Sequence, residues 1–150
     1  MGASTNSNEE LFRKFGPGPG GEYVFIEDDG SVAYAYLLDC NSSIIANVWL
    51  YNREFPSDTK PWNSDTTPTY VNPRPFADSN SRILRPWHGD EISVRWHQGG
   101  NSTLARIFYK KELFAVLESI EKIGWSKFAL EAGPLAKPLR DWREPDVQEQ

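Results

Sequence analysis

The fold of this chain is decided by residues 22–38, EYVFIEDDGSVAYAYLL. Two runs rich in aromatic and β-branched residues, 22–27 and 32–38, flank Asp29-Gly30, a dipeptide that favours a two-residue hairpin turn. In that register Phe25 pairs with Tyr34 and Tyr23 with Tyr36, so the large rings share one face. Small and aliphatic side chains occupy the other face. Because both faces are apolar, we expect this hairpin to be covered on both sides or to lie in the middle of a sheet.

Outward from this hairpin, the chain continues as further strands. Residues 44–51, IIANVWLY, predict a third strand that completes a meander. A second hairpin is predicted from residues 90–97 and 102–109, with Gly99-Gly100 as its turn. Together these segments indicate a mainly antiparallel sheet of about five strands.

Residues 111–123 have the spacing of an amphipathic helix. Their apolar positions are Leu113, Val116, Leu117, Ile120 and Ile123. Gly124 follows as a helix stop. We therefore expect an α+β domain, in which one main C-terminal helix packs on the sheet.

The predicted organisation is a single domain, 22–139, with a flexible leader and linker at 1–21 and a charged tail at 140–150. The linker ends in the Pro/Gly run GPGPGG at 16–21, which cannot continue a helix. Residues 53–80 are rich in proline and predict a long loop, and loops of that length are often functional. Trp62, Tyr70, Phe76 and Trp87 lie in or beside it. These rings either fill the core beneath the loop or form an interface.

Composition and charge exclude several classes of protein. The 150 residues carry a net charge of −5, which disfavours nonspecific nucleic-acid binding. Residues 1–60 hold 9 acidic and 4 basic residues, so this half would attract a basic partner, such as a nucleic-acid-handling protein. No apolar run approaches a membrane span, and no signal-peptide pattern opens the sequence. The lone Cys40 excludes an internal disulfide, and we expect a cytoplasmic protein.

Candidate catalytic and metal-binding groups are few. His88 stands in PWHGD, 86–90, where Asp90 could orient its imidazole toward a nucleophile such as Ser93. No established hydrolase spacing accompanies it, nor does one accompany His97, so we expect neither to be catalytic. Glu27-Asp28-Asp29 lacks the alternating spacing of a calcium loop. The prolines in 16–21 remove the N–H donors of a phosphate cradle. We expect no metal and no cofactor.

One resemblance follows from the opening strands. Residues 23–39, YVFIEDDGSVAYAYLLD, followed by VWLYN at 48–52, resemble the opening of a family of small bacterial proteins of unknown function. More loosely, they resemble the one-domain α+β immunity proteins of bacterial toxin systems. The resemblance covers about a third of the chain. It implies a small, acidic, cytoplasmic protein that is not an enzyme.

We therefore expect an immunity-type inhibitor that occludes the active site of a cognate toxin or binds another basic protein. The expected partner-binding residues are an acidic group and three loop aromatics: Glu27, Asp28, Asp29, Asp39, Trp62, Tyr70 and Trp87. The alternative is a small hydrolase or ligand-binding domain that uses His88, Asp90 and the rings of Trp62 and Trp87. A third class, a structural subunit, would show a large apolar patch and a stable oligomer. The sequence leaves the oligomeric state open.

Overall fold

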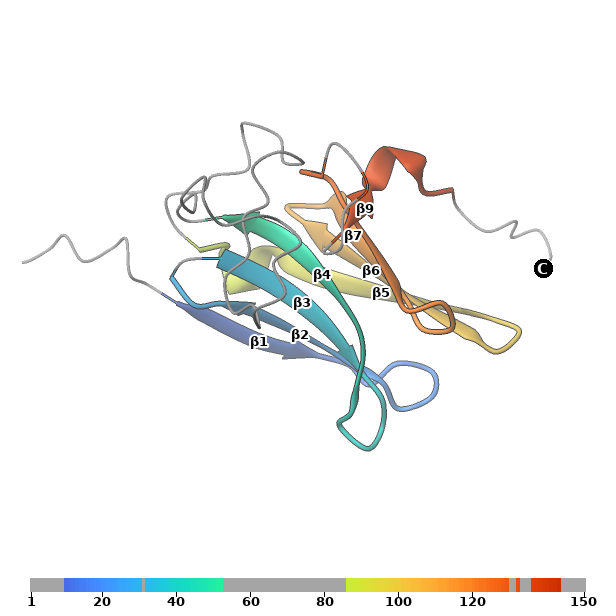
Figure 1. Cartoon of the computed structure of the whole chain (residues 1–150). Coiled ribbons are helices and arrows are strands. Elements are labelled where there is room, and N and C mark those ends of the chain that lie inside the picture. The colour runs from blue at the N-terminus through green and yellow to red at the C-terminus, as the bar shows by residue number, and fades with distance from the viewer. Residues whose placement is uncertain (1–9, 31, 53–85, 130–131, 133–135, 144–150) are drawn as a thin grey trace, which may run out of the picture.

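The computed structural model describes residues 10–30, 32–52, 86–129, 132 and 136–143. The regular secondary structure of the described chain is nearly all β-strand and forms two sheets that pack as two layers (Figure 1). The whole of the predicted Pro-rich loop, 53–80, including Trp62, Tyr70 and Phe76, lies outside the described residues. None of the helical segments in the described part of the chain is long and apolar enough to cross a membrane.

The first sheet contains four antiparallel strands in sequence order. They are β1 (Leu11–Phe15), β2 (Tyr23–Asp28), β3 (Val32–Leu38) and β4 (Ile44–Asn52). The predicted meander, β2 to β4, is thus confirmed. Strand β1 comes from residues assigned above to the leader, and it pairs along the edge of β2.

The second sheet contains five strands, also in sequence order. They are β5 (Ile92–Gly99), β6 (Ser102–Tyr109), β7 (Glu112–Glu118), β8 (Ile123–Ser126) and β9 (Lys137–Pro138). The predicted second hairpin is confirmed as β5–β6, but it starts a sheet of its own and does not join the first. Only the β8–β9 pair is parallel among the described strands. Two short 3-10 turns, η4 (Gly89–Glu91) and η5 (Leu139–Asp141), flank this sheet.

The predicted α+β fold with a C-terminal helix is wrong. Residues 112–118 form β7, a central strand in which the run from Phe114 to Leu117 is buried on both faces. A short continuous apolar run is typical of such a strand, and periodicity alone cannot distinguish it from a buried helix. The two-residue turn Lys110–Lys111 precedes β7, and both residues have positive φ, as a type I′ hairpin requires.

Both predicted hairpin registers are displaced by two residues. Phe25 pairs with Tyr36 instead of Tyr34, because the β2–β3 connection is longer than the Asp29-Gly30 turn alone. Asp28 accepts a hydrogen bond from the Gly30 N–H, and Asp29 accepts one from the Val32 N–H. In β5–β6, Gly99 pairs with Ser102, so the turn lies one residue later than predicted. A shift of two residues leaves each side chain on its predicted face.

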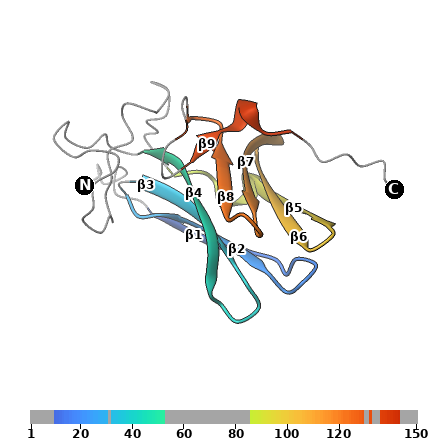
Figure 2. The same ribbon diagram turned by 45° about the vertical axis from the view of Figure 1, so that its right-hand side comes forward.

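The core lies between the inner faces of the two sheets. Strand β4 packs against β7 and β8, and Figure 2 shows β4 beside β8. Small residues allow this close approach: Ala33, Ala35, Ala105 and Ala115 are all fully buried. Gly124, predicted as a helix stop, lies within β8. A β-carbon there would be 2.5 Å from Cβ of Val48, so this position excludes any side chain.

Candidate functional site

The outer face of the four-stranded sheet carries a cluster of aromatic side chains. Strand pairing arranges these side chains in three rows that run across the strands. Phe12 shares one row with Glu27 and Tyr34. Phe25 lies beside Tyr36 in the next row, and Tyr23 shares the third row with Ile44. The alternate residues of the same strands point into the core. We call this surface the aromatic face, and its members are Phe12, Tyr23, Phe25, Glu27, Tyr34, Tyr36 and Ile44.

The aromatic face is hollowed and open to solvent. A cavity of about 400 Å³ is lined by Phe12 from edge strand β1, Phe25 from β2, Tyr36 from β3 and Ile44 from edge strand β4. Phe12 is 62% exposed and Ile44 is 61% exposed. They are two of the three large hydrophobic side chains that the described residues expose. Both sides of the hollow thus offer apolar surface to a partner.

Contacts within the face hold its rings in place. Phe12 meets Phe25 edge to face at 5.2 Å between ring centroids, and Tyr34 lies 6.1 Å from Tyr36. The ammonium group of Lys14 stands 4.2 Å from the centroid of the Tyr23 ring. Rings that are already positioned lose little side-chain entropy on binding, which favours an interface.

Two tyrosine hydroxyls of this face stay neutral well into the alkaline range. Burial raises the pKa of Tyr34 far above its usual value, and the charges of Tyr36 and Asp29 add to the rise. Burial also raises the pKa of Tyr36, with Glu27 and Asp29 contributing. The carboxylates of Glu27 and Asp29, both exposed, thus give this end of the face a negative potential.

The structure divides the predicted acidic residues among three places. Glu27 and Asp29 are exposed at the end of the aromatic face. Asp28 is fully buried and accepts a hydrogen bond from the Tyr51 hydroxyl at 2.7 Å, so it serves the core and does not reach a partner. Asp39 follows β3 at the opposite end of the strands, roughly 20 Å from Asp29 at about 3.3 Å per residue. There it caps its own turn by accepting the N–H groups of Asn41 and Ser43.

The one described member of the predicted aromatic trio is part of the core. Trp87 is 5% exposed and stacks on Tyr109 with 4.3 Å between centroids. Its backbone N–H donates to the Tyr51 hydroxyl at 3.1 Å. Trp87 is therefore unavailable to a partner, while Trp62 and Tyr70 lie outside the described residues.

The residues of the hydrolase alternative are not gathered as a catalytic group. His88 is exposed, and its backbone is held by two hydrogen bonds: its N–H donates to the Tyr109 hydroxyl at 3.0 Å, and its carbonyl accepts the Glu91 N–H at 2.9 Å. The Asp90 side chain is 91% exposed and faces Arg13 at 3.8 Å. Within the ranges that the structure describes, no three His, Cys, Asp or Glu side chains gather as a metal site requires.

Sequence reasoning missed Phe12, Ile44 and the openness of the tyrosine row. The alternation VAYAY in β3 does place the tyrosines on one face and the alanines on the other, but it does not show that the tyrosine face is open to solvent. Phe12 lies in the predicted leader, and nothing in the local sequence indicates its pairing with β2. Comparisons of the chain with models of protein families, with curated proteins and with solved structures find no match.

Proposed function

We propose that this protein is a protein-binding inhibitor of the immunity type, which acts in the cytoplasm and neutralises a toxin by laying its aromatic face over the toxin's active site. The observation that carries the proposal is the exposure of Phe12 and Ile44 on opposite edge strands around one hollow. Exposed apolar surface that is rimmed by polar groups marks interaction sites in soluble proteins.

The chemistry of the face supports a protein partner. Tyrosine and other aromatic residues are enriched in the centres of protein interfaces, where a few well-packed side chains contribute most of the affinity. Full burial of a Phe or Ile side chain contributes about 1.5–3 kcal/mol, and more than half of the surface of Phe12 and Ile44 is still in water. Tyr34 and Tyr36 add amphipathic rings that tolerate both apolar and polar neighbours.

Charge supports a basic partner. The chain carries a net charge of −5, and the exposed Glu27 and Asp29 lie at one end of the face. Lys14 is the basic residue on the same face, and its ammonium group lies over the rings of Tyr23 and Phe25. Complementary charge accelerates association and orients the encounter, so a toxin with a basic active site fits this surface.

The test uses the product of the gene adjacent to the one that encodes this protein. We expect that product to arrest growth when it is expressed alone, and we expect co-expression of this protein to restore growth. Phe12→Ala and Ile44→Ala should each weaken the purified complex at least about tenfold, or about 1.4 kcal/mol. An adjacent gene product whose toxicity this protein fails to relieve would refute the proposal.

Two matched variants separate the aromatic face from the rest of the surface. Ile120→Ala removes a similarly exposed side chain, 56% accessible, from the turn after β7. Glu91→Lys reverses the charge of an exposed acidic residue outside the aromatic face, and it is compared with Glu27→Lys. We expect Glu27→Lys to slow association and Glu91→Lys and Ile120→Ala to leave affinity unchanged. Equal losses from Ile120→Ala and Phe12→Ala would exclude the aromatic face as the interface.

A further inference from the structure

The outer face of the five-stranded sheet holds a second hollow, at the end where the β5–β6 and β7–β8 turns lie. One lobe, of about 470 Å³, is lined by Trp125 of β8, Ile120 and Glu121 of the β7–β8 turn, and Asn101 of the β5–β6 turn. An adjoining lobe of about 250 Å³ is lined by His97, Leu104 and Trp142. The lobes share Gly99, Ser102, Glu118 and Trp125, so they form one groove, which we call the indole groove.

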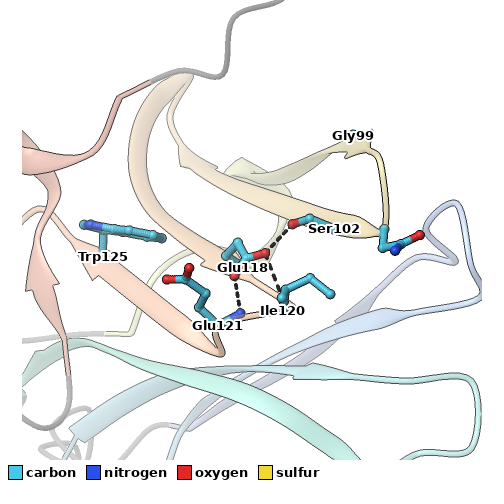
Figure 3. A pocket seen from close by; sticks show the side chains of 7 residues that line it. Gly99, Ser102, Glu118, Ile120, Glu121 and Trp125 are labelled. Atoms are coloured by element: carbon cyan, nitrogen blue, oxygen red, sulfur yellow. Dashed lines mark hydrogen bonds between the residues drawn. The ribbon is translucent and has the colours of Figure 1, made fainter.

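The two carboxylates of this groove have different roles. Glu118 accepts hydrogen bonds from the Ser102 hydroxyl and from the N–H groups of Ile120 and Glu121, the last two at 2.9 and 2.6 Å. Because both carboxylate oxygens of Glu118 already accept hydrogen bonds, this residue offers a ligand its negative charge more than new hydrogen bonds. Glu121 is exposed, and its carboxylate is available to accept further donors. Figure 3 shows Glu118, Glu121 and the Trp125 ring around the same hollow.

Aromatic rings and acids in one groove are complementary to a planar organic cation. A guanidinium group stacks on an indole and donates two parallel N–H bonds to a carboxylate, which a compact ammonium does not do. The exposed side chain of Ile120, 56% accessible, adds apolar surface for the alkyl stem that carries such a group. A bare metal ion fits less well, because the described residues offer no group of three metal ligands.

We propose that the indole groove binds a guanidinium group, which stacks on Trp125 and donates to the Glu121 carboxylate. The group could belong to a free guanidino compound or to an exposed arginine of a peptide, and both present the same chemistry. This site lies on the second sheet and is independent of the aromatic face and of any toxin.

The test is a titration of the purified protein, followed by NMR of its backbone amides and indole N–H groups. The probes are methylguanidinium, N-acetyl-arginine amide and its neutral counterpart N-acetyl-citrulline amide. We expect the two cations to shift resonances of residues 99–104 and 118–125 with millimolar Kd, and the citrulline compound to bind at least tenfold more weakly. Tighter binding of the arginine amide than of methylguanidinium would indicate an arginine side chain, and the reverse would indicate a free compound.

Variants distinguish this groove from general charge attraction. Glu121→Gln should weaken the binding of N-acetyl-arginine amide at least tenfold. Glu112→Gln, at the other end of β7, should leave the Kd for this compound unchanged. Glu112→Gln removes one negative charge, as Glu121→Gln does, and Glu112, which is exposed and paired with Lys127, does not line the groove. Equal binding of the arginine and citrulline compounds, no shifts at these residues, or unchanged affinity in Glu121→Gln would each overturn the proposal. A preference for neutral sugars over the cations would also overturn it.

Discussion

The Tyr51 hydroxyl donates a hydrogen bond to Oδ2 of Asp28 over 2.7 Å, although both residues are fully buried. Asp28, Ala33 and Tyr51 lie side by side across β2, β3 and β4, and the small Ala33 lets the phenol reach across. The same hydroxyl accepts the backbone N–H of Trp87, which ties the segment before β5 to the first sheet.

Replacing Tyr51 with Phe removes this link. The change leaves two buried polar groups, on Asp28 and Trp87, each with one hydrogen bond fewer, so we expect the free energy of unfolding to fall by about 1–3 kcal/mol. Urea denaturation measures the loss. The matched variant Tyr36→Phe, on the half-exposed aromatic face, should change the free energy of unfolding by no more than about 0.5 kcal/mol. Equal losses of unfolding free energy in the two variants would show that the hydrogen bonds of the Tyr51 hydroxyl add nothing to stability.

Gly124→Ala tests the closest approach of the two sheets. The added carbon would stand 2.5 Å from Cβ of Val48 and 2.9 Å from the Asn47 carbonyl oxygen, so β4 and β8 must separate. Overpacking of this kind costs about 1–3 kcal/mol of stability. Gly99→Ala is the control, because its nearest neighbour, Nε2 of His97, is 3.6 Å away. A Gly124→Ala protein with the urea midpoint of Gly99→Ala would contradict the packing described.

Alkaline pH tests the tyrosines of the aromatic face. The folded state raises the pKa of Tyr34 and Tyr36 above the ordinary 10.0, so only the unfolded chain loses these protons just above pH 10. Stability is therefore fully present below pH 10 and falls as pH rises further, by at most about 1.4 kcal/mol per pH unit for Tyr34. Urea midpoints across this range should fall less steeply in Tyr34→Phe than in the unaltered protein. Identical slopes would contradict the burial of this hydroxyl.

Acid pH tests the hydrogen bonds to Glu118. Burial alone would raise the pKa of this carboxyl, but donation from the Ser102 hydroxyl and from the N–H groups of Glu121, Ile120 and Lys122 outweighs it and lowers the pKa below 4.5. The stabilising effect of Glu118 is thus present above pH 4.5 and is lost as pH falls through the lowered folded-state value.

Ser102→Ala removes the hydroxyl donor, so NMR titration of the Glu118 carboxyl should show its pKa rising toward the ordinary value. Ser93→Ala, an exposed serine on the neighbouring strand β5, should leave that pKa unchanged. A Glu118 titration that does not respond to Ser102→Ala would show that the backbone donors alone lower the pKa.

Much of the strand content was predictable from local patterns. The alternation in 22–38 and the apolar runs at 44–51 and 92–109 correctly indicated β2 to β6. In the two hairpins they also placed the side chains on the correct faces, because side chains on a strand alternate with a period of two. The predicted acidic group at 27–29 is only partly exposed, because Glu27 and Asp29 face solvent while Asp28 is buried. The run at 113–117 was ambiguous, since a short apolar segment fits a buried strand as well as a helix.

The sequence by itself therefore determined that β2 to β6 extend, which face of the first hairpin is aromatic, and the acidic charge. Only the tertiary structure decided that the strands divide into two packed sheets, that β1 pairs along β2, and that Asp28 is buried while Asp29 is exposed. The physical reason is that local alternation depends on backbone geometry within one strand. Sheet partition, register and burial depend on contacts between residues distant in the chain, such as Val48 with Gly124 and Tyr51 with Asp28.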